Sequence, residues 1–234
     1  MTAILEATGI RRVFMGGDGE PIEVLSGVDL AVARGEFVAI VGASGAGKST
    51  LLQILGALDP PTGGQVALDG VAYDRLSEAE LAGLRNQRIG FVFQFHHLLR
   101  EFSALENVMM PMLISGSDPD AARDHAAALL DSMGLAARLS HRPAQLSGGE
   151  QQRVAVARAL AMKPVLVLAD EPSGNLDYHH AEQLHELFAR LAREFETALV
   201  VVTHNRQLAG RAERILSMES GHLVPHPGWE AMST

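Results

Sequence analysis

The sequence predicts an α/β protein in which a mixed sheet with flanking helices carries an inserted helical subdomain. First, a short apolar run, Phe37–Val41, precedes a glycine-rich loop and then a helical pattern. Second, apolar runs at 88–93, 165–169 and 198–202 alternate with helical patterns, as parallel strands with crossover helices do. Third, residues 103–139 contain helix signals with no strand between them, which indicates an all-helical insertion.

Composition limits the classes of protein to which the chain can belong. Its 234 residues suffice for one large α/β domain, or for one domain with a small subdomain. The net charge of −9 disfavours a nucleic-acid partner, because such proteins usually carry a basic face. The chain has no cysteine, which excludes disulfides, thiol catalysis and cysteine-bound zinc. Since there is no signal pattern and no apolar run near the roughly 18 residues of a membrane span, we expect a soluble protein that faces the cytoplasm.

The segment at the start of the chain predicts an antiparallel β part. Residues 3–8 and 28–33 have strand patterns, and a turn-rich loop at 15–21 lies between them. Phe14 ends the first strand, where an aromatic ring could stack on adenine or belong to the core.

The phosphate loop, residues 42–50, is the most specific motif in the sequence. It matches G-x-x-x-x-G-K-[ST] at Gly42, Gly47, Lys48 and Ser49, with a strand before it and a helix after it. Glycines let backbone N–H groups surround phosphate oxygens, and the N-terminus of the following helix adds partial positive charge. We expect Lys48 to reach the β- and γ-phosphates of ATP and Ser49 to bind Mg²⁺. The residues expected to hold the nucleotide here are Gly42, Ala43, Ser44, Gly45, Ala46, Gly47, Lys48, Ser49 and Thr50.

A strand pattern at 65–70 begins the middle of the chain. Several sequence signals for helix N-termini follow it. Residues 77–80 and 103–106 each have the Ser-x-x-Glu pattern of a capping box. We expect the second of these helices to bend or end near Pro111. An Asp-Pro pair at 118–119 begins a third helix, which glycine 134 ends.

Strands and helices alternate again after the insertion. One helix is expected to run to about Met162. Another is expected over 179–195, an exposed helix that carries His179, His180 and His185. Segments 213–218 and 222–224 predict a small strand pair, and we expect the tail from Pro225 to be flexible.

An apolar strand that ends in two acids predicts the metal side of the nucleotide site. Asp170 and Glu171 follow the 165–169 run, at the edge where open α/β sheets bind ligands. We expect Asp170 to lie on the Mg²⁺ side and Glu171 to polarise the attacking water. The alternative is that two acids merely end a strand.

The signature segment, residues 146–150, predicts a second anion site. A serine and two glycines stand directly before a helix, which exposes N–H groups and a hydroxyl. One phosphate loop already serves one triphosphate. We therefore expect the second cradle to close on the nucleotide of another copy of the chain, through Ser147, Gly148, Gly149 and Glu150.

These motifs, in this order, resemble the ATP-binding subunits of ABC transporters over nearly the whole chain. The signature segment looks like the signature sequence of that family, and residues 173–177 look like its D-loop at the dimer interface. Gln94 lies where the family has its Q-loop glutamine, which contacts the metal and links to the membrane subunit. His204 matches the switch histidine that contacts the γ-phosphate, and Phe14 matches the adenine-stacking aromatic.

The resemblance implies an ABC-type P-loop NTPase that hydrolyses ATP with Mg²⁺. Glu171, His204 and Gln94 would be catalytic, while Ser49, Gln94 and Asp170 would hold the metal. Two copies would form a head-to-tail dimer with two ATP molecules in the interface, and its closure would drive membrane subunits between conformations. The implied division is an ATPase core of residues 1–94 and 146–224, a helical subdomain at approximately 95–145 and a flexible tail at 225–234.

A finer resemblance concerns the membrane partner. Residues 94–108, together with 84–87 and 141–143, look like the ATPase subunits of lipoprotein-releasing (Lol) systems. This implies integral membrane permease subunits of the Lol type as partners, lipoprotein as an indirect substrate, and a peripheral position on the cytoplasmic face of the bacterial inner membrane. The family usually has proline, threonine and aspartate where this chain has Arg100, Ser173 and Asn205.

Other ABC proteins share parts of this pattern. ATPases of macrolide exporters, and of a cell-division complex that signals rather than transports, have the same catalytic motifs, and only the 94–108 stretch argues against them. DNA-repair and chromosome ATPases of the ABC type need a large insertion between the phosphate loop and the signature segment, where this chain has room for about one helical subdomain. The membrane partner therefore discriminates between the remaining functions.

Overall fold

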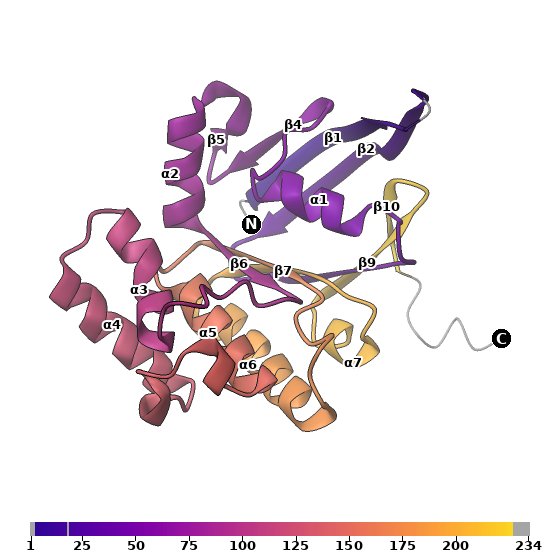
Figure 1. The fold of residues 1–234 in the computed structure, drawn as a ribbon. Coiled ribbons are helices and arrows are strands. Elements are labelled where there is room, and N and C mark those ends of the chain that lie inside the picture. Colours follow the sequence, from indigo (N-terminus) through magenta and orange to yellow (C-terminus); the bar gives the residue numbers. More distant parts are fainter. Residues whose placement is uncertain (1–2, 18, 227–234) are drawn as a thin grey trace.

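The computed structural model describes residues 3–17 and 19–226 and contains ten strands and seven α-helices within them (Figure 1). The strands are β1 (Ala3–Met15), β2 (Pro21–Ala33), β3 (Phe37–Val41), β4 (Gly63–Leu68), β5 (Val71–Ala72), β6 (Ile89–Phe93), β7 (Leu166–Asp170), β8 (Ala198–Val202), β9 (Arg214–Glu219) and β10 (His222–Pro225). The α-helices are α1 (Lys48–Leu55), α2 (Glu78–Arg88), α3 (Ala104–Ile114), α4 (Pro119–Ser132), α5 (Gly148–Leu160), α6 (Tyr178–Phe195) and α7 (Arg206–Ala209). Short 3-10 helices cover Tyr73–Arg75, Ala136–Arg138 and Pro143–Gln145.

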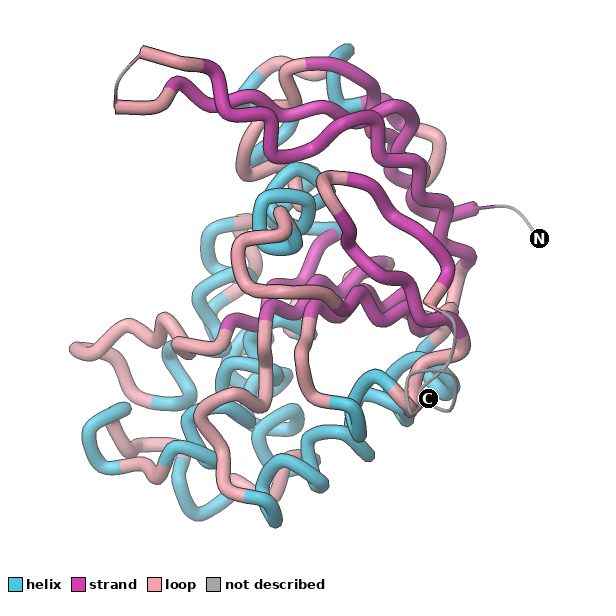
Figure 2. The backbone as a smooth tube through the Cα atoms, turned by 90° about the vertical axis from the view of Figure 1, so that its right-hand side faces the viewer, coloured by secondary structure: helices cyan, strands magenta, loops and turns pink. Residues whose placement is uncertain are grey.

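The strands form two sheets that lie on either side of α1 (Figures 1 and 2). The smaller, antiparallel sheet has the order β2-β1-β4-β5, and the larger has the order β10-β9-β3-β8-β7-β6. In the larger sheet, all neighbours from β9 to β6 run parallel, and β10 is antiparallel to β9. The predicted mixed sheet and the predicted antiparallel β part are therefore both present.

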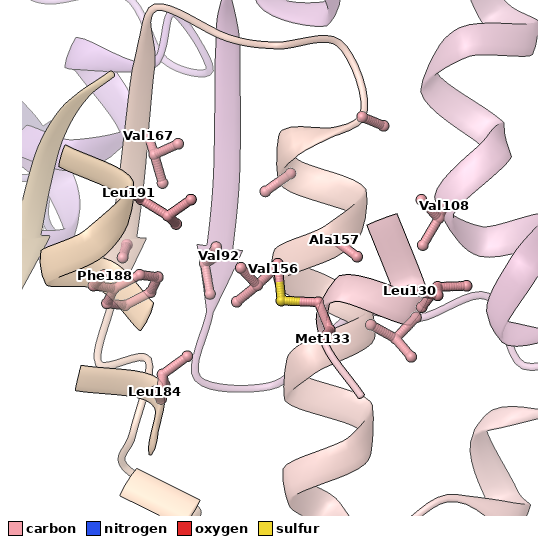
Figure 3. Packing of buried hydrophobic residues seen from close by; sticks show 14 of the residues in the cluster. Val92, Val108, Leu130, Met133, Val156, Ala157, Val167, Leu184, Phe188 and Leu191 are labelled. Carbon is pink, nitrogen blue, oxygen red and sulfur yellow. The ribbon is translucent and has the colours of Figure 1, made fainter. Parts of the chain in front are cut away.

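Alternate residues of the central strands face two different hydrophobic clusters. Leu166 and Leu168 of β7 pack in the cluster that contains α1 and the antiparallel sheet. Val167, between them, packs in the cluster that contains α5 and α6, where Val156 of α5 lies between the sheet and the outer helices (Figure 3). A strand buried on both faces has no polar alternation, which explains why the sequence shows an unbroken apolar run.

The helical insertion packs on α5 and has no core of its own. Val108 of α3 and Leu130 of α4 belong to the same cluster as Val156 (Figure 3). α3 was expected to bend or end near Pro111, and the helix does not end there but continues to Ile114. Burial of Met109 and Met112 on either side of the proline holds the helix together, so tertiary packing outweighs the lost backbone hydrogen bond.

The β1–β2 hairpin extends well beyond the strands predicted at 3–8 and 28–33. Pairing continues to Met15 and Pro21, past a register shift near Gly9 and Gly27. These two glycines have φ values of +60° and +95°, which is typical of a β-bulge. The glycines look like strand ends in the sequence, whereas the structure uses them to bend a continuous ladder.

The last strands extend the main sheet as well as pairing with each other. β9 runs parallel to β3, which attaches this predicted strand pair to the strand before the phosphate loop. Pro225 is the last residue of β10, so the predicted flexible tail begins inside a strand. Residues 227–234 of that tail lie outside the described residues. No helix in the described ranges has the length and apolarity needed to cross a membrane.

Candidate nucleotide site

A cleft of about 850 Å³ opens at the carboxyl ends of the parallel strands. Residues that follow three neighbouring strands line it together with the phosphate loop, and Val24 of β2 contributes from the antiparallel sheet. The predicted site residues that line the cleft are Gly42, Ser44, Gly45, Gly47, Lys48, Ser49, Thr50, Gln94, Asp170, Glu171 and His204. Residues far apart in the chain therefore meet where open α/β sheets bind ligands.

Backbone crowding explains two glycines of the phosphate loop. A Cβ atom on Gly42 would lie 2.7 Å from the carbonyl oxygen of Met218, and one on Gly47 would lie 2.9 Å from that of Val24. Both glycines also have positive φ values, of +147° and +99°. The loop therefore depends on glycine for its close fit against β9 and the hairpin.

Lys48 supplies a buried positive charge in this loop. The residue is 9% exposed, and its Nζ donates hydrogen bonds to the carbonyl oxygens of Gly42 at 2.9 Å and Ala43 at 2.8 Å. Carbonyl dipoles thus replace the water that a buried ammonium group loses. The phosphate loop, the ammonium group and the start of α1 together fit the phosphates of a nucleotide.

Ser49 and Asp170 form the candidate Mg²⁺ site. Burial raises the pKa of the Asp170 carboxyl, and a hydrogen bond from Ser49 and the nearby Lys48 charge oppose that rise. A hydroxyl, a carboxylate and the amide oxygen of Gln94 are hard oxygen ligands of the kind that Mg²⁺ prefers. Within the described residues, no group of three or more His, Asp or Glu side chains is arranged to hold a metal. These candidate ligands would leave coordination positions of Mg²⁺ for phosphate oxygens, as is usual for that ion.

Glu171 is held in one orientation by the segment after β8. Its carboxylate accepts a hydrogen bond from Thr203 Oγ1 at 3.1 Å and from the backbone N–H of His204 at 3.3 Å. The Nδ1 atom of His204 lies 2.8 Å from Oε1 of Glu171. The residue has a φ of +44°, a strained value that non-glycine residues adopt mainly where the surroundings impose it. The two predicted catalytic residues are thus in direct contact.

Gln94 joins the cleft to the D-loop, residues 173–177. Its Nε2 atom donates to Oδ1 of Asn175 at 3.3 Å, and Nδ2 of Asn175 donates to the carbonyl oxygen of Gln94 at 3.0 Å. A Cβ atom on Gly174 would lie 2.9 Å from Nε2 of Gln94. The residue after β6 and the D-loop therefore hold each other by reciprocal hydrogen bonds.

The signature segment lies outside the cleft formed by its own chain, because none of its residues lines it. Ser147 is the N-cap of α5: Oγ accepts the backbone N–H of Glu150 at 3.2 Å, and the Glu150 carboxylate accepts that of Ser147 at 2.8 Å. Arg138 donates to the same carboxylate at 2.9 Å and, with these serine contacts, lowers the pKa of Glu150 to about 2. Glu150 therefore helps to cap the N-terminus of α5, the helix to which it belongs.

Phe14 lies away from the cleft wall. It is 39% exposed near the end of the β1–β2 hairpin, and the guanidinium of Arg12 lies 4.6 Å from the centre of its ring. Phe14 does not line the cleft, and Val24 is the hairpin residue that does. The structure thus does not bring the predicted adenine-stacking residue together with the other site residues.

One of the three histidines expected on an exposed face is buried. His179 and His180 lie at the exposed start of α6, but His185 has no exposed surface. Its Nε2 atom lies 3.2 Å from Oγ of Ser173, and its Nδ1 atom lies 3.4 Å from Glu182. The expectation failed because residues 179 and 185 lie on different sides of the helix, and the second side packs against the sheet.

The structure also identifies residues that the sequence analysis did not single out. Thr203 orients Glu171, Asn175 holds Gln94, and Arg138 holds Glu150. The Ser-x-x-Glu pattern at 147–150 is the same capping box that identified two other helix starts, so this contact could have been found. Nothing in the local sequence points to Arg138.

The chain belongs to the ABC transporter family, whose family model matches residues 25–174. Among curated relatives, the lipoprotein-releasing system ATP-binding protein LolD of Bordetella pertussis is 57% identical over 94% of this chain and 95% of the relative. The protein of the same name from Psychrobacter arcticus is 52% identical over 95% of this chain and 98% of the relative. The predicted resemblance to ABC transporter subunits of the lipoprotein-releasing type is confirmed.

Solved structures agree with this assignment. The dimeric ATP-binding cassette MJ0796, in a post-hydrolysis state bound to ADP and Pi, superposes with a TM-score of 0.87 at 38% identity, covering 96% of this chain and 100% of that chain. The cbiO1 protein of Clostridium perfringens, part of the ABC transporter complex cbiONQ, has a TM-score of 0.83 at 26% identity, covering 96% and 88% of the two chains. The predicted ABC ATPase fold and the ATP-hydrolysing class are thus confirmed.

Proposed function

We propose that this chain is the ATP-hydrolysing subunit of an ABC transporter that releases lipoproteins from the bacterial inner membrane toward a periplasmic carrier. The observation that carries the proposal is the cleft, which gathers the phosphate loop, Gln94, Asp170, Glu171 and His204 at one edge of the sheet. The lipoprotein assignment rests on the 57% identity to LolD of Bordetella pertussis over most of both chains.

The cleft residues have different roles in ATP hydrolysis. Lys48 and the N–H groups of the phosphate loop hold the phosphates, and Ser49, Asp170 and Gln94 hold Mg²⁺. The metal, when bound, neutralises charge that develops on the phosphoryl oxygens. Glu171 accepts a proton from the attacking water, since its carboxylate is already oriented by hydrogen bonds from Thr203 and His204.

The signature segment serves a second copy of the chain. Its residues lie outside the cleft of their own chain. Ser147, Gly148 and Gly149 at the start of α5 close on the nucleotide of a partner copy, and Glu150 fixes that helix start through the capping box. The similarity to the dimeric cassette MJ0796 supports a head-to-tail dimer with ATP in the interface. In that arrangement, Phe14 stacks on adenine.

An exposed apolar group beside the cleft is the surface for the membrane permease subunits. Phe95 is 68% exposed, Leu99 41% and Phe102 37%, and all three lie in the 94–108 stretch that resembles Lol subunits. This stretch begins the helical subdomain at 95–145, which sits against the ATPase core of residues 1–94 and 146–224. The chain is accordingly a peripheral subunit on the cytoplasmic face of the inner membrane.

The test is recovery of the membrane partner. Tagged Glu171→Gln protein with ATP, which should accumulate the closed dimer, is used to capture partners from detergent-solubilised membranes for mass spectrometry. Leu99→Ser should lose the partner and keep ATP binding, because Leu99 does not line the nucleotide cleft. Val71→Ser is the matched control, because it changes an apolar residue of similar exposure, 42%, on β5 at the edge of the antiparallel sheet.

The identity of the captured proteins decides between the functions. Membrane subunits with a large periplasmic domain that co-purify with lipoproteins support lipoprotein release. A macrolide exporter or a cell-division partner would contradict the lipoprotein assignment while leaving the ATPase assignment intact. Absence of any membrane partner would contradict the transporter function.

A further inference from the structure

A partly buried arginine on α5, Arg158, binds the backbone that follows Gln94. Nη1 of Arg158 donates to the carbonyl oxygen of His97 at 2.7 Å, and Nη2 donates to that of His96 at 2.9 Å. Burial lowers the pKa of the Arg158 guanidinium, as expected where carbonyl groups replace water around a cation. A planar guanidinium can bind two successive carbonyls at once, which the point charge of lysine cannot do as well.

The bound backbone belongs to a segment without regular secondary structure. Residues 94–99 form neither helix nor strand, so contacts from outside must determine their path. His97 has a φ of +47°, which is uncommon for a residue with a side chain. Both Gln94 and His97 line the nucleotide cleft, and the His97 ring packs edge-on against Phe93 at 5.2 Å. The position of this segment therefore affects the cleft directly.

The same helix, α5, also connects Arg158 to the signature segment. α5 begins directly after Ser147 and carries Arg158 three turns later. Gln151, in the first turn of α5, donates to the carbonyl oxygens of Pro143 and Leu146 at 3.1 Å each. Side chains of α5 therefore bind two backbone segments: the one that leads into the signature segment and the one that follows Gln94.

We propose that Arg158 is a positioning residue that couples the signature segment to residues 95–99. A nucleotide held by the signature segment shifts α5, and the two Arg158 hydrogen bonds carry that shift to the backbone beside Gln94. By reciprocity, a partner bound at residues 95–99 changes how the signature segment meets nucleotide. The part of this inference that involves a membrane subunit rests on the proposed function.

Hydrogen exchange of the full chain tests the connection without any membrane partner. In the wild type, the non-hydrolysable analogue AMP-PNP should slow amide exchange at residues 96–99. In Arg158→Gln, these amides should exchange at least about tenfold faster without nucleotide, and AMP-PNP should no longer slow them. AMP-PNP is added at a saturating concentration for each variant, so that exchange is compared at equal nucleotide occupancy. Arg158→Lys keeps the charge and should give an intermediate result.

Arg85→Gln is the matched control. Arg85 also donates to a backbone carbonyl, that of Ala57 at 2.7 Å, but it does so from α2. This variant should leave exchange at 96–99 and its response to AMP-PNP unchanged. An equal effect of both variants would reduce Arg158 to a general structural role and overturn the proposal.

A second measurement uses the complex with membrane subunits. Stimulation of ATP hydrolysis by those subunits should fall at least about fivefold in kcat for Arg158→Gln, with KM for ATP little changed. Full stimulation, or an AMP-PNP response at 96–99 that matches the wild type, would overturn the inference. A wild-type chain that no membrane subunit stimulates would contradict the proposed function instead, and the exchange experiment would still decide the role of Arg158.

Discussion

Replacement of Glu171 by glutamine is the sharpest test of the nucleotide site. The substitution keeps the size of the side chain and an oxygen that can accept from Thr203 and from the His204 N–H. It removes the negative charge that allows the group to take a proton from water. The side chain is 17% exposed, so it is partly shielded from bulk solvent that could substitute for it.

The expected magnitude follows from the value of a positioned base. Such a group contributes about 10²–10⁴ to the rate, which corresponds to about 3–5 kcal/mol of the activation barrier. We therefore expect kcat of Glu171→Gln to fall by that factor. ATP affinity should change by less than about threefold, because the phosphate loop and Lys48 are untouched.

The assay combines steady-state phosphate release with equilibrium ATP binding on the same preparations. Glu36→Gln is a suitable control, because Glu36 also accepts a backbone N–H, that of Ala33 at 2.7 Å, and pairs with Arg214 at 3.1 Å, outside the cleft. Turnover within about threefold of the wild type would remove Glu171 from the role of base. A loss of ATP binding would mean that the residue holds nucleotide or the cleft itself.

Three further predictions concern affinity, packing and pH. Lys48→Ala should weaken ATP binding at least about tenfold in titration calorimetry, and unchanged affinity would contradict its phosphate role. Gly90→Ala should lower the melting temperature by roughly 3–10 °C, because its Cβ would lie 2.4 Å from the carbonyl oxygen of Ala159; Gly83→Ala, which meets no neighbour, should not lower it. Burial lowers the pKa of His185 from 6.5, so below that pH the unfolded chain binds more protons and stability falls. In denaturant titrations from pH 7 to 5, the free energy of unfolding should depend less steeply on pH in His185→Asn than in the wild type. An equal slope in both proteins would exclude His185 as the cause of the pH dependence.

Features formed within a few residues could be predicted from the sequence alone. The Ser-x-x-Glu pairs at 77–80 and 103–106 form capping boxes in the structure, as their local hydrogen bonds require. Asp118 caps α4, and the phosphate loop stands between a buried strand and a helix. In each case the interacting atoms lie in one short segment, so residue type and spacing determine the geometry.

Features that join distant segments depended on the tertiary structure. Gln94 and Asn175 are 81 residues apart, and Arg158 binds carbonyls 61 and 62 residues away. Burial of His185 and the separation of Ser147 from its own cleft likewise depend on how α5 and α6 pack against the sheet. The sequence by itself determined the fold class, the phosphate loop and the resemblance to ABC transporter subunits. Which side chains meet across the fold was decided by packing, because contacts between distant residues leave no periodic pattern in the local sequence.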